Sequence, residues 1–340
     1  MNTANLFAAN GEKVSLLILD ETSKSFYPIA DNVQVLHHSL SFGITPEGNI
    51  ISRKIKLLSD VLKLRRVLKE LQPSLVIASE YPFAVAAILS GAKKYAKIVS
   101  WEHHHYAWLK KNRFWSYLCD QTYPRLNGIV CLNKEEESYH KKIAPTFVIP
   151  NFVENNSGKI STTRSKTILS VGWLIPRKGI DLLLQAAKQV LTHHPGWTWK
   201  LVGDGEMKEQ VLQFIKAEKL EGRFLLQAPS RADINDEYTN ASLFVLSSRY
   251  EAFPMVLLEA MSFGVPCISF DCPSGPADII INNKNGLLVK KEDTVKLVAA
   301  ISSLITDDEL RKEMGVAALE SAQRFSPGTI YRQWKERIFT

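Results

Sequence analysis

The sequence is poor in cysteine and has no long apolar run. Its four cysteines, Cys119, Cys131, Cys267 and Cys272, form no Cys-x-x-Cys pair among 340 residues. A chain of this size needs no disulfides to hold its core, so a reducing cytoplasm is the expected compartment. No apolar run approaches the ~20 residues of a membrane-spanning helix, and no basic segment followed by an apolar one opens the sequence. We therefore expect neither a spanning segment nor an export signal.

Two short motifs of other enzyme classes are missing or incomplete. No Asp-x-Asp occurs, although metal-dependent transferases often use that motif to neutralise a diphosphate. Gly203 and Gly205 are spaced as in a dinucleotide fingerprint, but Met207 and Lys208 supply no third glycine. A nicotinamide enzyme is therefore a weak alternative.

The composition is that of an ordinary soluble globular protein. Hydrophobic residues make up 45% of the chain and charged residues 23%, as in ordinary globular domains. The length exceeds the usual size of a single core, which predicts two domains. Strand-like apolar runs alternate with helical segments, the order that is typical of parallel sheets.

The formal net charge of +7 is concentrated in one segment. Seven lysines and arginines lie between Arg53 and Lys69 against one acid, Asp60, and apolar residues are interleaved with them. This pattern predicts an amphipathic basic helix over residues 51–71. It indicates either a surface helix with solvated bases or a helix that is attracted to anionic lipid headgroups.

A second basic and aromatic segment lies at residues 106–117 and includes Trp108. It would suit a lipid-linked molecule or the membrane interface itself. No nucleic-acid-binding motif accompanies either basic segment, so nucleic acid is not an expected partner.

Residues 241–289 contain the strongest candidate site. A strand at residues 243–246 leads through a polar loop to Glu251, and Glu259 follows eight residues later, where we expect it to open a helix at Ala260. Helix N-termini carry unpaired N–H groups, so a carboxylate there can hold polar ligand groups while backbone amides bind an anion. The simpler alternative is a loop glutamate and a helix-dipole partner.

The segment 264–289 extends this pattern with Gly-Val-Pro, a short strand and Asn-Gly. Together with Glu251 and Glu259 it resembles the donor-binding half of the retaining glycosyltransferases of family 4, which carry a Glu-x7-Glu signature. The resemblance implies the GT-B fold, in which two Rossmann-like, doubly wound α/β domains face a cleft. It places an acceptor-side domain at residues 1–153, to which residues 327–340 cross back. The nucleotide-sugar donor domain would occupy residues 165–326.

The start of the chain departs from that family. Family members usually open with a strand, a glycine-rich loop and the first half of a helix. Residues 1–10 resemble the end of such a helix, and the first glycine is Gly11. We therefore expect the N-terminal domain to lack its first strand and glycine-rich loop, with Met1 a late start or a truncation. The missing strand would ordinarily lie in the middle of the parallel sheet.

A glycine-bounded turn with basic residues follows the strand that opens the second domain. Such a turn before a helix can bind phosphate through backbone amides and charged side chains, or it can be a plain turn with exposed bases. The resemblance favours phosphate binding, because Gly172 and Lys178 match the family. Trp173 replaces the usual arginine, and Arg177 is a possible stand-in for that phosphate contact.

The resemblance also implies which residues act on the donor. Glu251 would contact the sugar hydroxyls, Glu259 the ribose hydroxyls and His103 the far end of the sugar. Glu251, His103 and Lys178 are the expected catalytic residues, and the loop at Gly203 would lie on the nucleotide side. The remaining donor-binding positions are Phe253, Pro254, Met255 and Val256.

His103 opens a run of three histidines after a strand predicted at residues 97–100. Neighbours in an extended segment point to alternate sides, so the three are unsuited to binding one ion. We expect no metal site there.

These features predict retaining transfer of a sugar from a UDP- or GDP-sugar to a glycan or lipid-linked acceptor, in exopolysaccharide or lipopolysaccharide synthesis, without cofactor or metal. The alternative is a non-catalytic or truncated module that binds a sugar nucleotide or an assembly partner without turnover. Trp173 and the abrupt start favour that alternative. The expected location is cytoplasmic, and the basic helix leaves peripheral contact with the inner face of an anionic membrane open.

Overall fold

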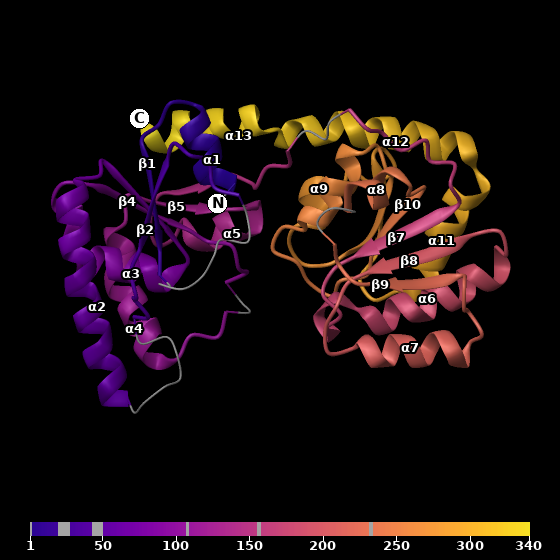
Figure 1. The fold of residues 1–340 in the computed structure, drawn as a ribbon, viewed down its shortest axis with the longest axis horizontal. Coiled ribbons are helices and arrows are strands. Elements are labelled where there is room, and N and C mark those ends of the chain that lie inside the picture. Colours follow the sequence, from indigo (N-terminus) through magenta and orange to yellow (C-terminus); the bar gives the residue numbers. More distant parts are fainter. Residues whose placement is uncertain (1, 20–27, 43–49, 107–108, 155–157, 231–233) are drawn as a thin grey trace. The chain divides into compact units, whose positions relative to one another are not determined.

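The computed structural model describes residues 2–19, 28–42, 50–106, 109–154, 158–230 and 234–340. The chain divides into two compact units (Figure 1). Unit 1 comprises Met1–Ile149 and Tyr331–Thr340, and unit 2 comprises Pro150–Ile330. Each unit is an α/β domain built on parallel strands, as the alternation of segments in the sequence predicts.

Unit 1 alternates helices with short strands. Its strands are β1 (Val14–Ile18), β2 (Val33–His37), β3 (Leu75–Ser79), β4 (Lys97–Trp101), β5 (Gly128–Cys131) and β6 (Thr146–Val148). Its helices are α1 (Asn2–Ala9), α2 (Ile50–Leu71), α3 (Tyr81–Leu89), α4 (Arg113–Thr122) and α5 (Lys134–His140).

Two of these helices, α4 and α5, are not predicted by the sequence analysis. Both are short, and both begin at an asparagine cap. The side chains of Asn112 and Asn133 each accept a hydrogen bond from the backbone N–H three residues further on. Capping of this kind stabilises the first turn of a helix whose apolar periodicity is weak.

The strands of unit 1 form two separate parallel sheets. β1 pairs with β2, while β3, β4, β5 and β6 pair in that order. Among the described residues, no strand joins one sheet to the other. The described strands of unit 1 therefore fall into two sets, each parallel within itself.

The core of unit 1 lies between its sheet and the helices α2 and α3. Ala84 and Val85 of α3 are fully buried, and α2 contributes Leu57, Val61 and Leu64. Because the side chains of α3 are small, this helix packs closely against β3 and β4. The packing fixes the ends of both strands and therefore the starting points of the segments that follow them.

Unit 2 contains six strands in one parallel sheet. They are β7 (Thr167–Val171), β8 (Thr198–Val202), β9 (Phe224–Gln227), β10 (Leu243–Leu246), β11 (Cys267–Asp271) and β12 (Gly286–Lys290). The helices after β7 are α6 (Ile180–His193), α7 (Lys208–Ala217), α8 (Ile234–Thr239), α9 (Met255–Ser262), α10 (Pro276–Ile279), α11 (Thr294–Thr306), α12 (Asp308–Ala322) and α13 (Pro327–Trp334). The division between the units falls within α13.

The strand order of unit 2 is β12-β11-β10-β7-β8-β9. The chain starts at β7, moves outward through β8 and β9, and then returns to pair β10 with the other side of β7. Figure 1 shows α6 and α7 along one side of this sheet and α8 and α9 along the other. In sheets of this type, ligands bind beyond the carboxyl ends of the strands at which the order reverses. Here those strands are β7 and β10.

Candidate active site

Two charged residues meet beyond the carboxyl ends of β7 and β10. Lys178 Nζ lies 2.6 Å from Glu251 Oε1, and Ser248 Oγ donates a hydrogen bond of 2.6 Å to the same oxygen. Only 16% of the Lys178 side chain and 8% of the Glu251 side chain are exposed, so the pair is shielded from water and its field is strong. The structure thus brings together two predicted catalytic residues that are 73 positions apart in the sequence.

Two glycines allow the loops of this site to approach each other. Gly179 has a φ of +63°, and a Cβ at this position would lie 2.0 Å from the carbonyl oxygen of Ser247. A Cβ at Gly203 would lie 2.1 Å from the carbonyl oxygen of Gly172. Side chains are therefore excluded at both positions. The predicted donor-binding residues Gly172 and Gly203 lie together at the ends of the neighbouring strands β7 and β8.

Arg249 ties the loop after β10 to the start of α6. Its guanidinium donates two hydrogen bonds to the carboxylate of Asp181, of 2.8 and 2.7 Å. These hydrogen bonds from Arg249 lower the pKa of Asp181, although burial opposes the change. The backbone N–H of Arg249 also donates to the carbonyl of Arg177. The bonds hold the loop that carries Lys178 against the loop that carries Glu251.

Arg177 and Trp173 lie on the surface of the same basic loop. The guanidinium carbon of Arg177 is 5.7 Å from the ring centre of Tyr250, and Arg177 is exposed. Trp173, which stands where family 4 usually has arginine, is 66% exposed. Neither side chain is needed for the core of unit 2, so both are accessible to a bound molecule.

The segment after Glu251 begins a helix earlier than predicted. α9 starts at Met255 with Pro254 at its N-cap in an extended conformation, a position where the missing N–H of proline removes no helical hydrogen bond. The first-turn amides of Met255 and Val256 therefore point out of the helix N-terminus, whereas Pro254 has no N–H to offer. The Phe253 side chain is buried against Phe325, with ring centres 5.8 Å apart.

The prediction that Glu259 opens this helix is wrong. Glu259 lies in the second turn of α9, where it accepts a hydrogen bond of 2.7 Å from the Tyr238 hydroxyl of α8. Burial raises the pKa of Glu259, and the hydrogen bond from Tyr238 opposes the rise. Because the helix dipole acts mainly within the first turn, the position of Glu259 also disfavours the helix-dipole alternative of the sequence analysis.

In unit 1, His103 and His104 follow β4 and share one carboxylate. The backbone N–H of His103 donates 2.8 Å to Glu80 Oε1, and His104 Nδ1 lies 2.7 Å from the same oxygen. The His103 ring packs against Trp101, with ring centres 4.3 Å apart. Burial lowers the pKa of His103, which favours the neutral imidazole at neutral pH.

Glu80 is a candidate functional residue that the sequence analysis does not single out. It directly follows β3, and its φ of 77° and ψ of 158° are rare for a residue other than glycine. Burial opposes ionisation, but the hydrogen bonds from His104 and His103 hold the pKa of Glu80 below its ordinary value. The position of Glu80 in the sequence could have identified it as a candidate, because polar residues at the carboxyl end of a parallel strand often face a ligand.

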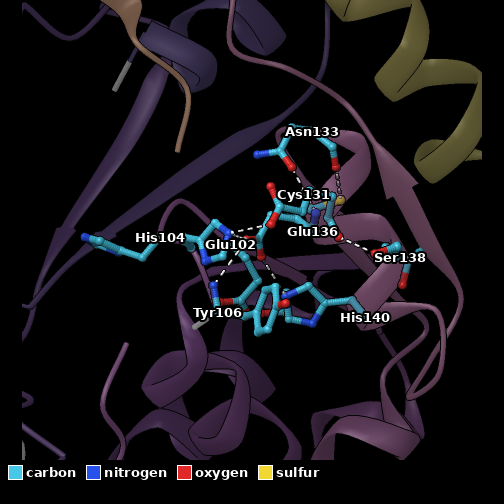
Figure 2. Close-up of polar contacts among 12 residues, drawn as sticks. Glu102, His104, Tyr106, Cys131, Asn133, Glu136, Ser138 and His140 are labelled. Carbon is cyan, nitrogen blue, oxygen red and sulfur yellow. Dashed lines mark hydrogen bonds and ion pairs between the residues drawn. The ribbon is translucent and has the colours of Figure 1, made fainter. Parts of the chain in front are cut away.

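A glutamate of helix α5 contacts residues 103–106, the segment after β4 that contains the three histidines and is here termed the histidine segment (Figure 2). Glu136 Oε1 accepts a hydrogen bond of 3.2 Å from the backbone N–H of Tyr106 and lies 3.7 Å from His105 Nε2. Its other oxygen lies 3.3 Å from His140 Nε2. The ring of Tyr106 stacks on that of Tyr139 at 3.9 Å. These contacts fix the backbone that presents His103 and His104.

Glu102 lies between Trp101 and His103 but belongs to the core. It accepts hydrogen bonds from the hydroxyls of Ser100 and Tyr123. Burial raises the pKa of Glu102 and that of Tyr123. This carboxyl group stabilises the interior of unit 1 and is not offered to a ligand.

The three histidines thus do not converge on one point, because His103 and His104 contact Glu80 whereas His105 contacts Glu135 and Glu136. In the part of the chain that the structure describes, no three His, Cys, Asp or Glu side chains are grouped as metal ligands. Nor does any described helix have the length and apolarity needed to cross a bilayer. Trp108, in the second basic segment, lies outside the described residues.

Comparison with known proteins gives the class of protein. Residues 1–156 match the family described as Glycosyltransferase Family 4, and residues 153–321 match the family described as Glycosyl transferases group 1. The two units therefore match glycosyltransferase domains of the family 4 and group 1 type, each over slightly less than half of the chain, and the predicted fold of two Rossmann-like α/β domains is confirmed.

Two relatives and one solved structure illustrate the proteins that the chain is similar to. The chain is 30% identical, over 98% of its length, to an exopolysaccharide phosphotransferase of Streptomyces coelicolor, of which it spans 36%. It is 24% identical, over 95% of its length, to a Campylobacter jejuni alpha-1,4-N-acetyl-D-galactosaminyltransferase named for a diNAcBac-PP-undecaprenol glycan, of which it spans 89%. The Anabaena protein HepE, solved in complex with UDP, superimposes with a TM-score of 0.73 and 21% identity over 90% of this chain and 86% of that one.

Proposed function

We propose that the chain transfers a sugar from a UDP- or GDP-sugar to a glycan or lipid-linked acceptor, with retention of the donor's anomeric configuration. The observation that carries the proposal is the pairing of Lys178 with Glu251 at 2.6 Å. Both residues follow strands at which the order of the sheet reverses, the place where open α/β sheets bind ligands. The match of unit 2 to the group 1 family supports the same reading.

In this proposal Lys178 stabilises the leaving group. As the bond between sugar and diphosphate breaks, negative charge grows on a phosphate oxygen, and a fixed ammonium group shielded from water stabilises that charge. No Asp-x-Asp occurs in the sequence. Arg177 supplies the further positive charge, without a metal ion. The N–H groups of Gly172 and Gly203 already donate to the carbonyls of Val202 and Gln227, so these glycines contribute by letting the loops approach closely.

Glu251 positions the sugar. Its carboxylate accepts hydrogen bonds from sugar hydroxyls, while the N-terminus of α9 at Met255 binds an anionic group. The acceptor hydroxyl forms a bond to the anomeric carbon on the face from which the diphosphate departs. Its proton passes to the departing phosphate oxygen, so one C–O bond forms as one breaks and the configuration is retained. The ribose contact of Glu259 and the sugar contact of His103 stay predictions.

The proposed acceptor belongs to bacterial surface glycans. One relative is named as an exopolysaccharide phosphotransferase and another for an undecaprenol-linked glycan. Both names fit a growing polysaccharide or lipid-linked oligosaccharide as acceptor. The corresponding location is cytoplasmic, with peripheral contact at the inner face of the membrane.

The test is a panel of UDP-, GDP- and ADP-sugars, assayed for thermal stabilisation and for slow release of free sugar. We expect one UDP- or GDP-sugar to stabilise the protein and to be hydrolysed. Lys178→Met and Glu251→Gln should each lower the rate by about 10²–10³-fold. Lys188→Met and Glu218→Gln, which break an exposed ion pair of 2.8 Å elsewhere in unit 2, serve as matched controls.

Two results would count against this function. Full activity in either site variant would remove Lys178 or Glu251 from the mechanism. Binding of a donor without turnover in the unmodified chain would favour the alternative of a non-catalytic sugar-nucleotide module, which the exposed Trp173 in place of arginine favours.

A further inference from the structure

The outward side of α2 carries a row of exposed apolar side chains, here termed the α2 stripe. Ile51, Ile55, Leu58 and Leu62 are 69%, 64%, 63% and 49% exposed. Their spacing of four, three and four residues places them in a single row along the helix. An ordinary surface helix has polar side chains at such positions.

The α2 stripe is distinct from the side of α2 that packs on unit 1. The core-facing residues Leu57, Val61, Leu64 and Leu68 are each 6% exposed and repeat with the same helical spacing. At about 100° per residue, the centres of the two rows lie roughly 120° apart around the helix, so the rows occupy separate sides of it. Because the core already covers one apolar side, α2 has a second one with no role in packing unit 1.

Positive side chains flank the α2 stripe on both sides. On the helical projection, Lys54 and Arg65 lie along one edge and Arg66 along the other, with Lys63 and the acid Glu70 further round on the same side, and all five are exposed. Asp60, the acid within the basic segment, is buried and contributes no charge to this face. Its carboxylate accepts hydrogen bonds from the backbone N–H groups of Ser41 and Phe42.

Helix α4 extends the same surface. Lys54 Nζ lies 5.3 Å from the ring centre of Phe114, the second residue of α4. One turn further along, Tyr117 is 61% exposed. Aromatic side chains with a polar tip, next to lysines, are typical of the boundary between lipid acyl chains and headgroups.

The charges decide what kind of partner fits. If a second copy of the chain packed on this face, Lys54, Arg65 and Arg66 of the two copies would lie close together. Such a contact is unfavourable because like charges repel. A bilayer that contains anionic lipids offers acyl chains to the α2 stripe and negative headgroups to both flanking rows at once.

We propose that the α2 stripe and its flanking bases form a docking surface for an anionic lipid bilayer. α2 lies along the interface, the stripe enters the headgroup region and the bases bind lipid phosphates. The surface belongs wholly to unit 1 and does not depend on the donor chemistry proposed for unit 2.

Vesicle binding tests the proposal. The intact protein is sedimented with vesicles of pure phosphatidylcholine and with vesicles containing one third phosphatidylglycerol, at low and high salt. We expect binding to the anionic vesicles alone, weakened by salt. Arg65→Gln with Arg66→Gln should reduce the partition coefficient about 25-fold, at roughly fivefold per charge. Leu58→Ser should reduce it about tenfold through lost apolar contact.

Control variants on unit 2 separate this surface from general stickiness. Val295→Ser removes a side chain that is 72% exposed on α11, and Lys296→Gln removes a neighbouring exposed charge. Neither should change vesicle binding. Release of sugar from a soluble donor, measured without vesicles, should be the same in the α2 variants as in the unmodified chain.

Three results would overturn the proposal. One is equal binding to neutral and anionic vesicles, and another is unchanged binding in the α2 variants when thermal unfolding shows that they are folded. The third is a dimer, detected by light scattering, that Leu58→Ser converts to a monomer. That result would assign the α2 stripe to a contact between two copies.

Discussion

Among single residues, the buried carboxyl groups have the clearest consequences for solution behaviour. Glu102 is 4% exposed and accepts hydrogen bonds from Ser100 and Tyr123. Burial raises its pKa, so the native state holds a proton that the unfolded chain loses at lower pH. Stability from this group is therefore complete below the ordinary glutamate pKa, and it is lost as the pH rises through the raised value.

Glu102→Gln should remove this dependence. The amide oxygen of glutamine can still accept from both hydroxyls, but the side chain does not titrate. The test is urea unfolding between acid and mildly alkaline pH. The unfolding free energy of the variant, relative to that of the unmodified protein, should increase as the pH rises, with a limiting slope of about 1.4 kcal/mol per pH unit. The exposed Glu309→Gln should give a constant difference. A difference between Glu102→Gln and the unmodified protein that does not change with pH would contradict the assignment.

At the scale of elements, the site of unit 2 depends on two loops that come unusually close. Gly179 makes the approach possible, since a Cβ would lie 2.0 Å from Ser247 O and the backbone has a φ of +63°. The same contact brings Lys178 to Glu251. A loop pair held this way is already formed before a donor binds, which reduces the cost of ordering it.

Gly179→Ala should therefore impair both folding and binding. Combined backbone strain and overlap predict a loss of about 3 kcal/mol in unfolding free energy, together with a loss of donor-induced thermal stabilisation. Gly196→Ala in the same unit, where no atom lies within 4 Å of the added Cβ, should change neither. Normal donor stabilisation in Gly179→Ala would show that the loops need not meet as described.

Helices α2 and α9 show that a sequence pattern can leave the buried side or the first residue of a helix undecided. Two apolar rows in α2 have the same helical spacing, so periodicity predicts the helix but does not say which row packs on the core. In α9, the apolar residues from Met255 to Leu258 suit either the end of a loop or the first turn of a helix. The helix begins directly after Pro254, earlier than the glutamate pattern indicates.

At the scale of the whole molecule, the last residues of the chain belong to unit 1 although unit 2 precedes them. Trp334 is fully buried and packs edge-on against Phe7 and Trp101, with ring centres 5.5 and 5.2 Å away. The first helix of the chain and the strand before the histidine segment are thus joined by a side chain from the C-terminus.

Trp334→Ala should destabilise unit 1 selectively. Loss of a fully buried tryptophan typically costs about 3–5 kcal/mol. Hydrogen exchange should accelerate in α1 and β4, while the strands of unit 2 keep their protection. Trp173→Ala, at a side chain that is 66% exposed, should leave exchange in both units unchanged. Equal loss of protection in unit 2 would contradict this account.

The sequence by itself determined the two α/β domains and most of the helices and strands, which follow from local periodicity and turn chemistry over a few residues. Lys178 and Glu251 became candidates through the resemblance to family 4. The tertiary structure alone decided that Lys178 pairs with Glu251, that Glu80 binds the histidine segment, and that the α2 stripe stays outside the core. Each of these depends on strand order or on which apolar row is covered, and local sequence contains no information about neighbours that the fold brings from far along the chain.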